Sequence, residues 1–167
     1  MSSPVLKRID GRYVHKIHDR NILIADVRRR PGEEEWFDAE MTHDMDHPFF
    51  FEHPLDHVPS MMLVEAGRQV GIAISHLFLG VPFGTIFATA SFDIRFTDFA
   101  EKLAPVIISV RVMDKRYRRG KLIRLRMIGY FSQGSRPLGS MEGDWSMLDP
   151  RLWKRYRKME QCRKRAG

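Results

Sequence analysis

One segment of this sequence, residues 60–79, is apolar or small around most of its circumference when it is drawn as a helix. Ser60 precedes the apolar residues and Gly80 follows them, which predicts a helix with Ser60 as its N-cap and Gly80 as its stop. A helix that is apolar on most sides is buried rather than laid on a surface. Gly67 and Gly71 lie one turn apart, and each costs about 1 kcal/mol of helix propensity. We therefore expect this face of the helix to approach another backbone closely.

The segments around this helix have the patterns of strands and loops. Before it we predict two strands within residues 13–30, a short strand in 35–41 and a proline-rich loop over 43–58. After it, apolar and polar residues alternate, as in half-buried strands, in 86–97, 106–112, 122–131 and 137–147. In the third of these, Ile123, Leu125 and Met127 are predicted to face inward. The sequence thus predicts an α+β fold: a single hotdog domain, with an antiparallel sheet wrapped around one long buried helix.

The length of 167 residues fits one domain. We divide it into a leader (1–12), the hotdog domain (13–149) and a basic C-terminal helix or tail (150–167). Cys162 is the single cysteine, which excludes an intrachain disulfide framework and a cysteine-rich zinc site. We see no secretory signal, and no apolar run reaches the roughly 18 residues of a membrane-spanning helix. We therefore expect a cytoplasmic protein without membrane contacts.

The formal net charge of +7 comes from the C-terminal tail. From Arg151 onward, eight Lys and Arg residues face one acid, Glu160, and the rest of the chain is neutral. A second basic stretch, residues 111–126, contains one acid, Asp114. Such patches inform on the electrostatics of partners rather than on the fold. We interpret the tail as a solvated helix end and expect no nucleic-acid partner.

A composite motif lies between residues 47 and 84: HPFFFEHPLDHVP at 47–59, LVEAGRQ at 63–69, SH at 75–76 and GVPFG at 80–84. It resembles the A-factor biosynthesis (AfsA-type) hotdog family and is distantly similar to hydroxyacyl-ACP dehydratases. The resemblance implies transfer of a β-ketoacyl group, from an acyl carrier protein or CoA thioester, to the hydroxyl of a small three-carbon acceptor. The product would be a butyrolactone-like signal or another specialised metabolite.

Two features depart from that family and its distant relatives. Typical members carry two hotdog copies, whereas this chain has room for one. We therefore expect a homodimer with an acyl-binding tunnel between subunits. Phe51 occupies the position of the dehydratases' catalytic histidine, so simple dehydration does not follow. A hotdog thioesterase or atypical dehydratase, and a non-catalytic module that binds an acyl ligand or a partner, remain as alternatives.

Glu65 is the leading catalytic candidate. It lies about one turn into the apolar helix, where burial would raise its pKa and suit it to acid–base work. The alternative is a carboxylate that stabilises the helix N-terminus. Arg68 and Gln69 share its side of the helix. Arg68 could hold an anion or oxyanion, or form an i,i+3 salt bridge with Glu65, and Gln69 is assigned to substrate binding.

Histidines and acids crowd the loop that precedes the helix: His43, His47, His53, His57, Asp44, Asp46, Glu52 and Asp56. His53 or His57 is predicted as an auxiliary general base. The alternatives are turn-forming loop residues and a zinc site, although the prolines exclude a helical HxxxH pair. We expect neither a metal nor another cofactor. His76, on the apolar helix, is predicted to be a hydrogen-bonded core residue.

Two further sets of residues complete the predicted site. Met61, Met62 and Phe51 are predicted to line the acyl tunnel. Acyl carrier proteins are acidic, so we assign carrier docking to Arg116, Arg118 and Arg119 in the second basic stretch.

Overall fold

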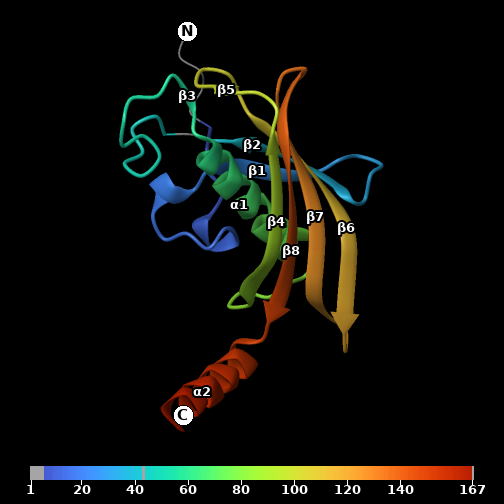
Figure 1. The fold of residues 1–167 in the computed structure, drawn as a ribbon. Coiled ribbons are helices and arrows are strands. Elements are labelled where there is room, and N and C mark those ends of the chain that lie inside the picture. The colour runs from blue at the N-terminus through green and yellow to red at the C-terminus, as the bar shows by residue number, and fades with distance from the viewer. Residues whose placement is uncertain (1–5, 43, 167) are drawn as a thin grey trace.

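The structure is a computed structural model, and it describes residues 6–42 and 44–166. A six-stranded antiparallel sheet, with strand order β1-β2-β6-β7-β8-β4, holds the long helix α1 against one face (Figure 1). A second, two-stranded sheet joins β3 and β5. The elements are η1 (Gly11–Tyr13), η2 (Asp19–Asn21), β1 (Ile24–Arg29), β2 (Trp36–Met41), β3 (His57–Val58), α1 (Ser60–Phe78), β4 (Ile86–Phe96), β5 (Ala100–Glu101), β6 (Ile107–Arg118), β7 (Lys121–Gln133), β8 (Arg136–Leu148) and α2 (Pro150–Ala166).

The predicted single buried helix and its antiparallel sheet are therefore confirmed. Residues 66–67 and 69–75 of α1 are all buried. A Cβ atom on Gly67 would lie 3.0 Å from the Met141 side chain, and one on Gly71 would lie 3.4 Å from Trp145. Both neighbours belong to β8, so the two glycines let α1 approach the sheet, as their spacing predicts.

The start of α1 differs from the prediction. Ser60 is its first helical residue, and Pro59 takes the N-cap position. The Pro59 carbonyl accepts a hydrogen bond from Met62 N at 2.9 Å, and no side chain caps this end. The opposite end agrees with the prediction, because the helix stops at Phe78 and Gly80 follows with φ +66°.

Two bulges interrupt the β6–β7 pairing. The register passes from the Val112–Met127 pair to Asp114–Arg126, and from Arg116–Arg124 to Tyr117–Leu122. The residues that it skips, Met113 and Ile123, are both exposed. A bulge adds one unpaired residue and so breaks the alternation of faces. The prediction that Ile123 faces the core is therefore wrong, and Leu122 takes the buried position.

The predicted strand before His18 is also wrong. Residues 11–21 instead form two short 3₁₀ turns, η1 and η2, and the first strand begins only at Ile24. His15, between these turns, has φ +56°. This left-handed conformation is incompatible with a strand. The segment 11–21 packs alongside α1 and supplies part of the site described below.

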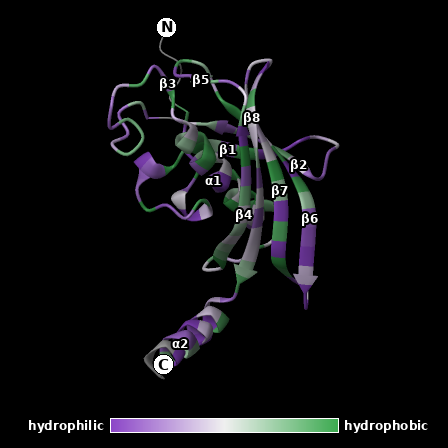
Figure 2. Ribbon diagram, viewed as in Figure 1, coloured by the Kyte–Doolittle hydropathy of each residue, from purple (hydrophilic) through white to green (hydrophobic). Residues whose placement is uncertain are grey.

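The C-terminal helix α2 projects away from the sheet (Figure 1). Figure 2 shows that it is largely hydrophilic, whereas α1 is largely hydrophobic. Trp153 and Tyr156 stack on one another with ring centroids 5.8 Å apart. Leu152, Tyr156 and Met159 are all exposed.

Candidate functional site

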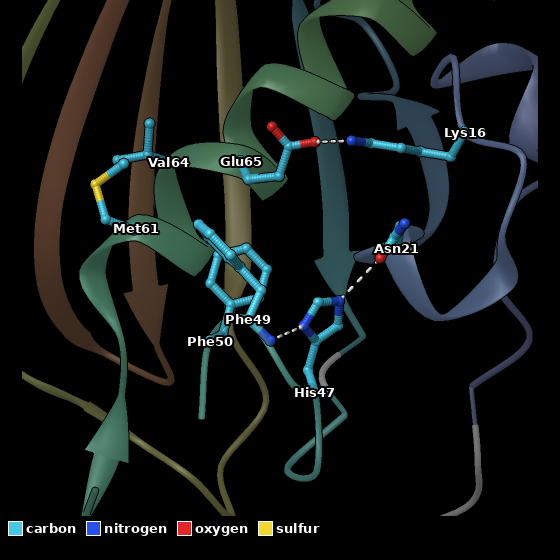
Figure 3. A pocket seen from close by; sticks show the side chains of 8 residues that line it. All are labelled: Lys16, Asn21, His47, Phe49, Phe50, Met61, Val64 and Glu65. Atoms are coloured by element: carbon cyan, nitrogen blue, oxygen red, sulfur yellow. Dashed lines mark hydrogen bonds and ion pairs between the residues drawn. The ribbon is translucent and has the colours of Figure 1, made fainter. Parts of the chain in front are cut away.

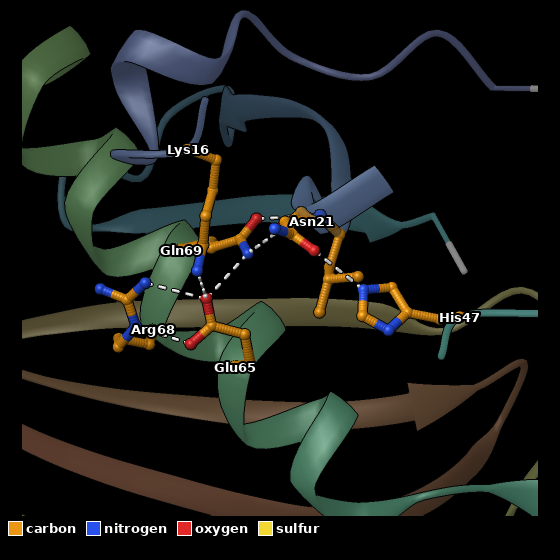
Figure 4. A network of polar contacts seen from close by, with 7 residues as sticks. Lys16, Asn21, His47, Glu65, Arg68 and Gln69 are labelled. Atoms are coloured by element: carbon orange, nitrogen blue, oxygen red, sulfur yellow. Dashed lines mark hydrogen bonds and ion pairs between the residues drawn. The ribbon is translucent and has the colours of Figure 1, made fainter. Parts of the chain in front are cut away.

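Glu65 lies at the centre of a charged network on the side of α1 that faces residues 11–21 (Figure 4). Arg68 donates to both carboxylate oxygens, from Nε at 2.7 Å and from Nη2 at 2.8 Å. Lys16 Nζ lies 2.8 Å from Oε1, and Gln69 Nε2 donates to the same oxygen at 2.9 Å. The i,i+3 salt bridge between Glu65 and Arg68 is thus formed. Two cations and one carboxylate leave this network with a net charge of +1.

The pKa of Glu65 contradicts the expectation from burial. Burial of the carboxyl group acts to raise the pKa, as expected. The hydrogen bonds and charge of Arg68, with the hydrogen bonds of Gln69 and Lys16, outweigh it and lower the pKa from 4.5 to about 2. The expected raised pKa is therefore wrong. Glu65 is a carboxylate near neutral pH and a weak base.

Gln69 is buried and holds the N-terminal segment to α1. Its Oε1 accepts from Leu23 N at 2.9 Å, and its Nε2 donates to Asn21 O at 2.8 Å. These backbone partners fix the orientation of the amide, since an N–H can only donate and a carbonyl can only accept. With Glu65 as a third partner, the amide is occupied by the protein itself. Gln69 therefore holds Glu65 and Asn21, two residues that line the pocket described next.

A pocket of about 430 Å³ opens beside Glu65 (Figure 3). That volume lies within the usual range for small-molecule sites, roughly 300–1,000 Å³. One part of its wall is apolar and the other carries charged and polar groups. The lining residues are Lys16, Asn21, His47, Phe49, Phe50, Met61, Val64 and Glu65.

His47 is the histidine of this pocket, and our sequence reasoning favoured two others. Its Nδ1 accepts from Phe49 N at 3.3 Å, so the hydrogen lies on Nε2, which donates to Asn21 Oδ1 at 3.0 Å. Burial, only partly offset by Asp44, lowers the pKa of His47. The residue is thus neutral with both nitrogens occupied. The motif at 47–59 begins with His47, and this is the sequence signal that could have pointed to His47 as the pocket histidine.

The two predicted auxiliary histidines lie outside the pocket. His53 is exposed on the loop. His57 is in β3, where its Nδ1 lies 2.7 Å from Asp56 Oδ1 and its ring is 5.0 Å from that of Phe99. It borders a different hollow, on the Ser60 and Leu63 side of the helix. The structure therefore does not bring either histidine to Glu65.

The three predicted acyl-contact residues occupy different environments. Met61 lines the pocket and is 62% exposed. Met62 is fully buried in the core. Phe51 is half-buried, with Lys102 over its ring at 5.3 Å, and its neighbours Phe49 and Phe50 line the pocket instead.

Much of the basic stretch at 111–126 is neutralised by neighbouring acids. Lys115 pairs with Glu35, Arg116 with Asp114, Arg124 with Asp144 and Arg126 with Glu142. Among the described residues, Arg118, Arg119 and Lys121 have no ion pair. They surround the tight β6–β7 turn, in which Arg119 and Gly120 have φ of +51° and +73°. Of the predicted docking residues, Arg118 and Arg119 therefore present free charge.

Residues 6–42 and 44–166 contain no group of three or more His, Cys, Asp or Glu side chains that could hold a metal ion. His43, one of the loop histidines, lies outside the described residues. No helix in this part of the chain is long and apolar enough to span a membrane.

Comparison with known proteins places this arrangement in context. Residues 2–149 match the model of the A-factor biosynthesis hotdog domain. A 52-residue segment is 48% identical to the 2-oxo-3-(phosphooxy)propyl 3-oxoalkanoate synthase of Streptomyces virginiae, covering 31% of this chain and only 16% of that enzyme.

Solved structures share the fold at low sequence identity. The dehydratase heterocomplex ApeI:P of Xenorhabdus doucetiae has a TM-score of 0.66 at 12% identity, covering 87% of this chain and 95% of that chain. A hot-dog-like protein from Thermanaerovibrio acidaminovorans has a TM-score of 0.58 at 12% identity, over 75% of this chain and 89% of that one. A thioesterase from Haemophilus influenzae has a TM-score of 0.53 at 12% identity, over 74% and 78%.

Proposed function

Since this chain belongs to the A-factor biosynthesis hotdog domain family, we propose that it is an enzyme that transfers a β-ketoacyl group from a thioester to a small hydroxylated acceptor. In this reaction the acceptor's hydroxyl oxygen attacks the thioester carbonyl. A C–O bond forms, the C–S bond breaks, and the hydroxyl proton ends on the departing thiolate. The product is an ester of the kind from which a butyrolactone-like signal or other specialised metabolite is made. The name of the Streptomyces virginiae relative supports this choice, because it describes an ester of a 3-oxoalkanoate with a phosphorylated three-carbon group.

The observation that carries the proposal is the two-sided wall of the pocket. Phe49, Phe50, Met61 and Val64 supply an apolar surface for an acyl chain. Lys16 and Glu65 line the other side of the pocket. Arg68 is hydrogen-bonded to Glu65 without being a lining residue itself. A ligand with an acyl chain and a phosphate has the same two-sided character.

Each charged residue then has a part in binding. Lys16 and Arg68 attract the phosphate of the acceptor, since the network has an excess of one positive charge. Glu65 fixes both cations in place. An acid–base role for Glu65 stays a prediction, and a carboxylate with a pKa of about 2 is better suited to accept hydrogen bonds than protons.

We further propose a homodimer that is joined through the edge of the six-stranded sheet. β4 is the last strand at one edge, and its 11 residues pair only with β8 among the described residues. A long unpaired edge is a template for another strand, and a second copy would satisfy it. Light scattering should then give about twice the chain mass of 19.6 kDa. A mass of one chain at micromolar concentration would contradict the dimer.

The assay for the function supplies a short β-ketoacyl thioester and dihydroxyacetone phosphate, and products are separated by mass spectrometry. The ester product supports transfer, and free β-keto acid alone would instead mean thioester hydrolysis. If neither product forms, the remaining interpretation is a non-catalytic module that binds an acyl ligand. Lys16→Gln should raise the KM for the phosphorylated acceptor with little change in the KM for the thioester. The control is Lys7→Gln, which removes an exposed lysine that lies outside this pocket.

A further inference from the structure

The C-terminal helix α2 carries apolar side chains on one of its sides. Leu152, Tyr156 and Met159 occur at i, i+4 and i+7, so they lie on the same side of the helix. Their exposed fractions are 64%, 54% and 69%. Trp153 borders them, and its ring stacks on that of Tyr156 with centroids 5.8 Å apart. These four side chains form what we call the apolar stripe of α2.

A second side of α2 is cationic. It consists of Arg151, Lys154, Arg155 and Lys158, which follow the same helical spacing and are all exposed. At 3.6 residues per turn, this cationic stripe lies about 120° around the helix from the apolar stripe. Within residues 150–163, whose side chains the structure describes, the only ion pair joins Arg163 to Glu160, at 4.0 Å. The charges of the cationic stripe are therefore not neutralised by the fold.

This combination indicates a binding face. Exposed apolar side chains that are rimmed by charged ones mark an interaction site more often than isolated apolar residues do. Like charges three and four residues apart on a helix repel one another. An anionic partner would relieve that repulsion, and an apolar environment would remove the stripe from water. The partner must therefore offer negative charge and apolar groups side by side along the helix.

A lipid bilayer with anionic headgroups meets this requirement best. The phosphates of a nucleic acid would pair with the cations and leave the apolar stripe in water. An acidic protein would have to supply a groove that matches the convex stripe. In a bilayer, Trp153 and Tyr156 have the amphipathic rings that are favoured at the membrane–water interface. With the apolar stripe facing the acyl chains, the cationic stripe lies at the depth of the headgroups.

We propose that α2 binds the surface of an anionic lipid bilayer, with its apolar stripe among the acyl chains and its cationic stripe among the headgroup phosphates. This goes beyond the proposed function and does not depend on it. It also goes beyond our interpretation of the tail as a solvated helix end. The expectation of no membrane contacts rested on the lack of a membrane-spanning segment, and a helix that lies in the interface needs none.

The position of α2 is compatible with an accessible pocket. The helix leaves the sheet at the end opposite to β3 and β5 (Figure 1). The pocket beside Glu65 is lined by residues in the first turns of α1, which follows β3 directly. Attachment through α2 therefore does not require the bilayer to cover the pocket.

The test measures co-sedimentation of the full chain with vesicles, without substrates. An equal mixture of phosphatidylcholine and phosphatidylglycerol should bind the protein at least about tenfold more tightly than phosphatidylcholine alone. Binding should weaken as the NaCl concentration rises from about 0.05 to about 0.5 M, because salt screens the cationic stripe. Equal binding to the two kinds of vesicle, or binding to neither, overturns the proposal.

Two double variants separate the contributions of the stripes. Tyr156→Gln with Met159→Gln keeps the charge and a good helix former, and should weaken binding to the mixed vesicles by roughly tenfold or more. Lys154→Gln with Lys158→Gln should weaken binding and reduce its dependence on salt. The control is Leu103→Gln, which removes a 94% exposed leucine just after β5 and should bind as wild type does. Unchanged binding in the first variant overturns insertion of the apolar stripe.

Trp153 provides a direct readout of insertion. Brominated acyl chains in the mixed vesicles should quench its fluorescence, because its ring borders the apolar stripe. Trp153→Phe keeps the aromatic bulk, so it should bind as wild type does and lose the quenching. Trp145 is buried in the core and Trp36 is stacked on Tyr130 of the sheet, so neither should contribute. Quenching that persists in Trp153→Phe overturns the insertion of α2.

The remaining outcomes identify another occupant. Binding to duplex DNA or to an acidic carrier protein, with none to the mixed vesicles, overturns the bilayer. A light-scattering mass that falls in the Tyr156→Gln, Met159→Gln variant would mean that a second copy covers the stripe, which also overturns it. Circular dichroism of each variant should match the wild type. If this variant loses helix content, the quenching of Trp153 in wild-type protein and its loss in Trp153→Phe decide the question.

Discussion

Replacing Glu65 by glutamine tests whether its ion pairs stabilise the fold. On folding, the pKa of Glu65 falls from 4.5 to about 2. A difference of about 2.5 pH units corresponds to about 3 kcal/mol, at 1.36 kcal/mol per unit. Because folding lowers this pKa, the ionised carboxylate stabilises the folded state above pH 4.5, and that contribution is lost as the pH falls toward 2. The side chain is 23% exposed, so solvent screens the pairs only in part.

Glu65→Gln should therefore lower the free energy of unfolding by about 3 kcal/mol at pH 7, and by about half of that at pH 3. Urea unfolding measures both values, with the fluorescence of the buried Trp145 as the probe and the protein concentration held constant because of the proposed dimerisation. Glu52→Gln removes an exposed carboxylate from the loop before α1 and should change neither value. An equal loss at pH 7 and pH 3 in Glu65→Gln would refute the linkage to ionised Glu65.

Three further predictions concern the helix and the charged residues. Gly71→Ala should raise the free energy of unfolding by up to about 1 kcal/mol, since its new Cβ meets Trp145 at an ordinary 3.4 Å. Gly67→Ala should raise it less, or lower it, because of the 3.0 Å contact with Met141. Equal urea midpoints for the two variants would contradict this. Arg68→Lys keeps the charge and loses the bidentate fork, so the acceptor's KM should rise while the thioester's does not, and an unchanged acceptor KM would remove Arg68 from phosphate binding. Reversing Arg118 and Arg119 to Glu should raise the KM for a carrier-bound acyl group but not for a short thioester, with a gap that shrinks as salt increases; equal effects on both donors would mean that the β6–β7 turn serves another purpose.

The fold was predictable where burial alone decides the structure. The apolar circumference of residues 60–79 specified α1 and its buried environment, and Gly67 and Gly71 indicated the close approach to the sheet. The alternation of apolar and polar residues after the helix predicted the strands of the antiparallel sheet. Ile123 was misplaced because a bulge depends on the pairing of two strands, which alternation within one strand does not reveal. The early strand was wrong because His15 takes a left-handed conformation that is stabilised by a contact with α1, 61 residues away.

The site was predictable only in part. The position of Glu65 and its pairing with Arg68 follow from helical spacing. The sign of its pKa shift was missed because burial was weighed without the hydrogen bonds and charge of Arg68, which lower the pKa most. Gln69 adds to this, and so does Lys16 from a segment 49 residues earlier in the chain. His47 was passed over for a similar reason. Residues 44–56 have no regular structure, so spacing could not tell which of their histidines turns toward α1.

The Gln69 amide has a consequence for how the molecule opens. It holds Leu23 N and Asn21 O much as a neighbouring strand would, although it is a side chain of α1. A buried amide that loses these partners leaves unsatisfied polar groups, so the N-terminal segment and α1 are expected to separate only in a concerted event. The Leu23 amide proton then exchanges with solvent only through that event. Its exchange rate is a built-in reporter of when the wall of the pocket formed by Lys16 and Asn21 comes away from the helix.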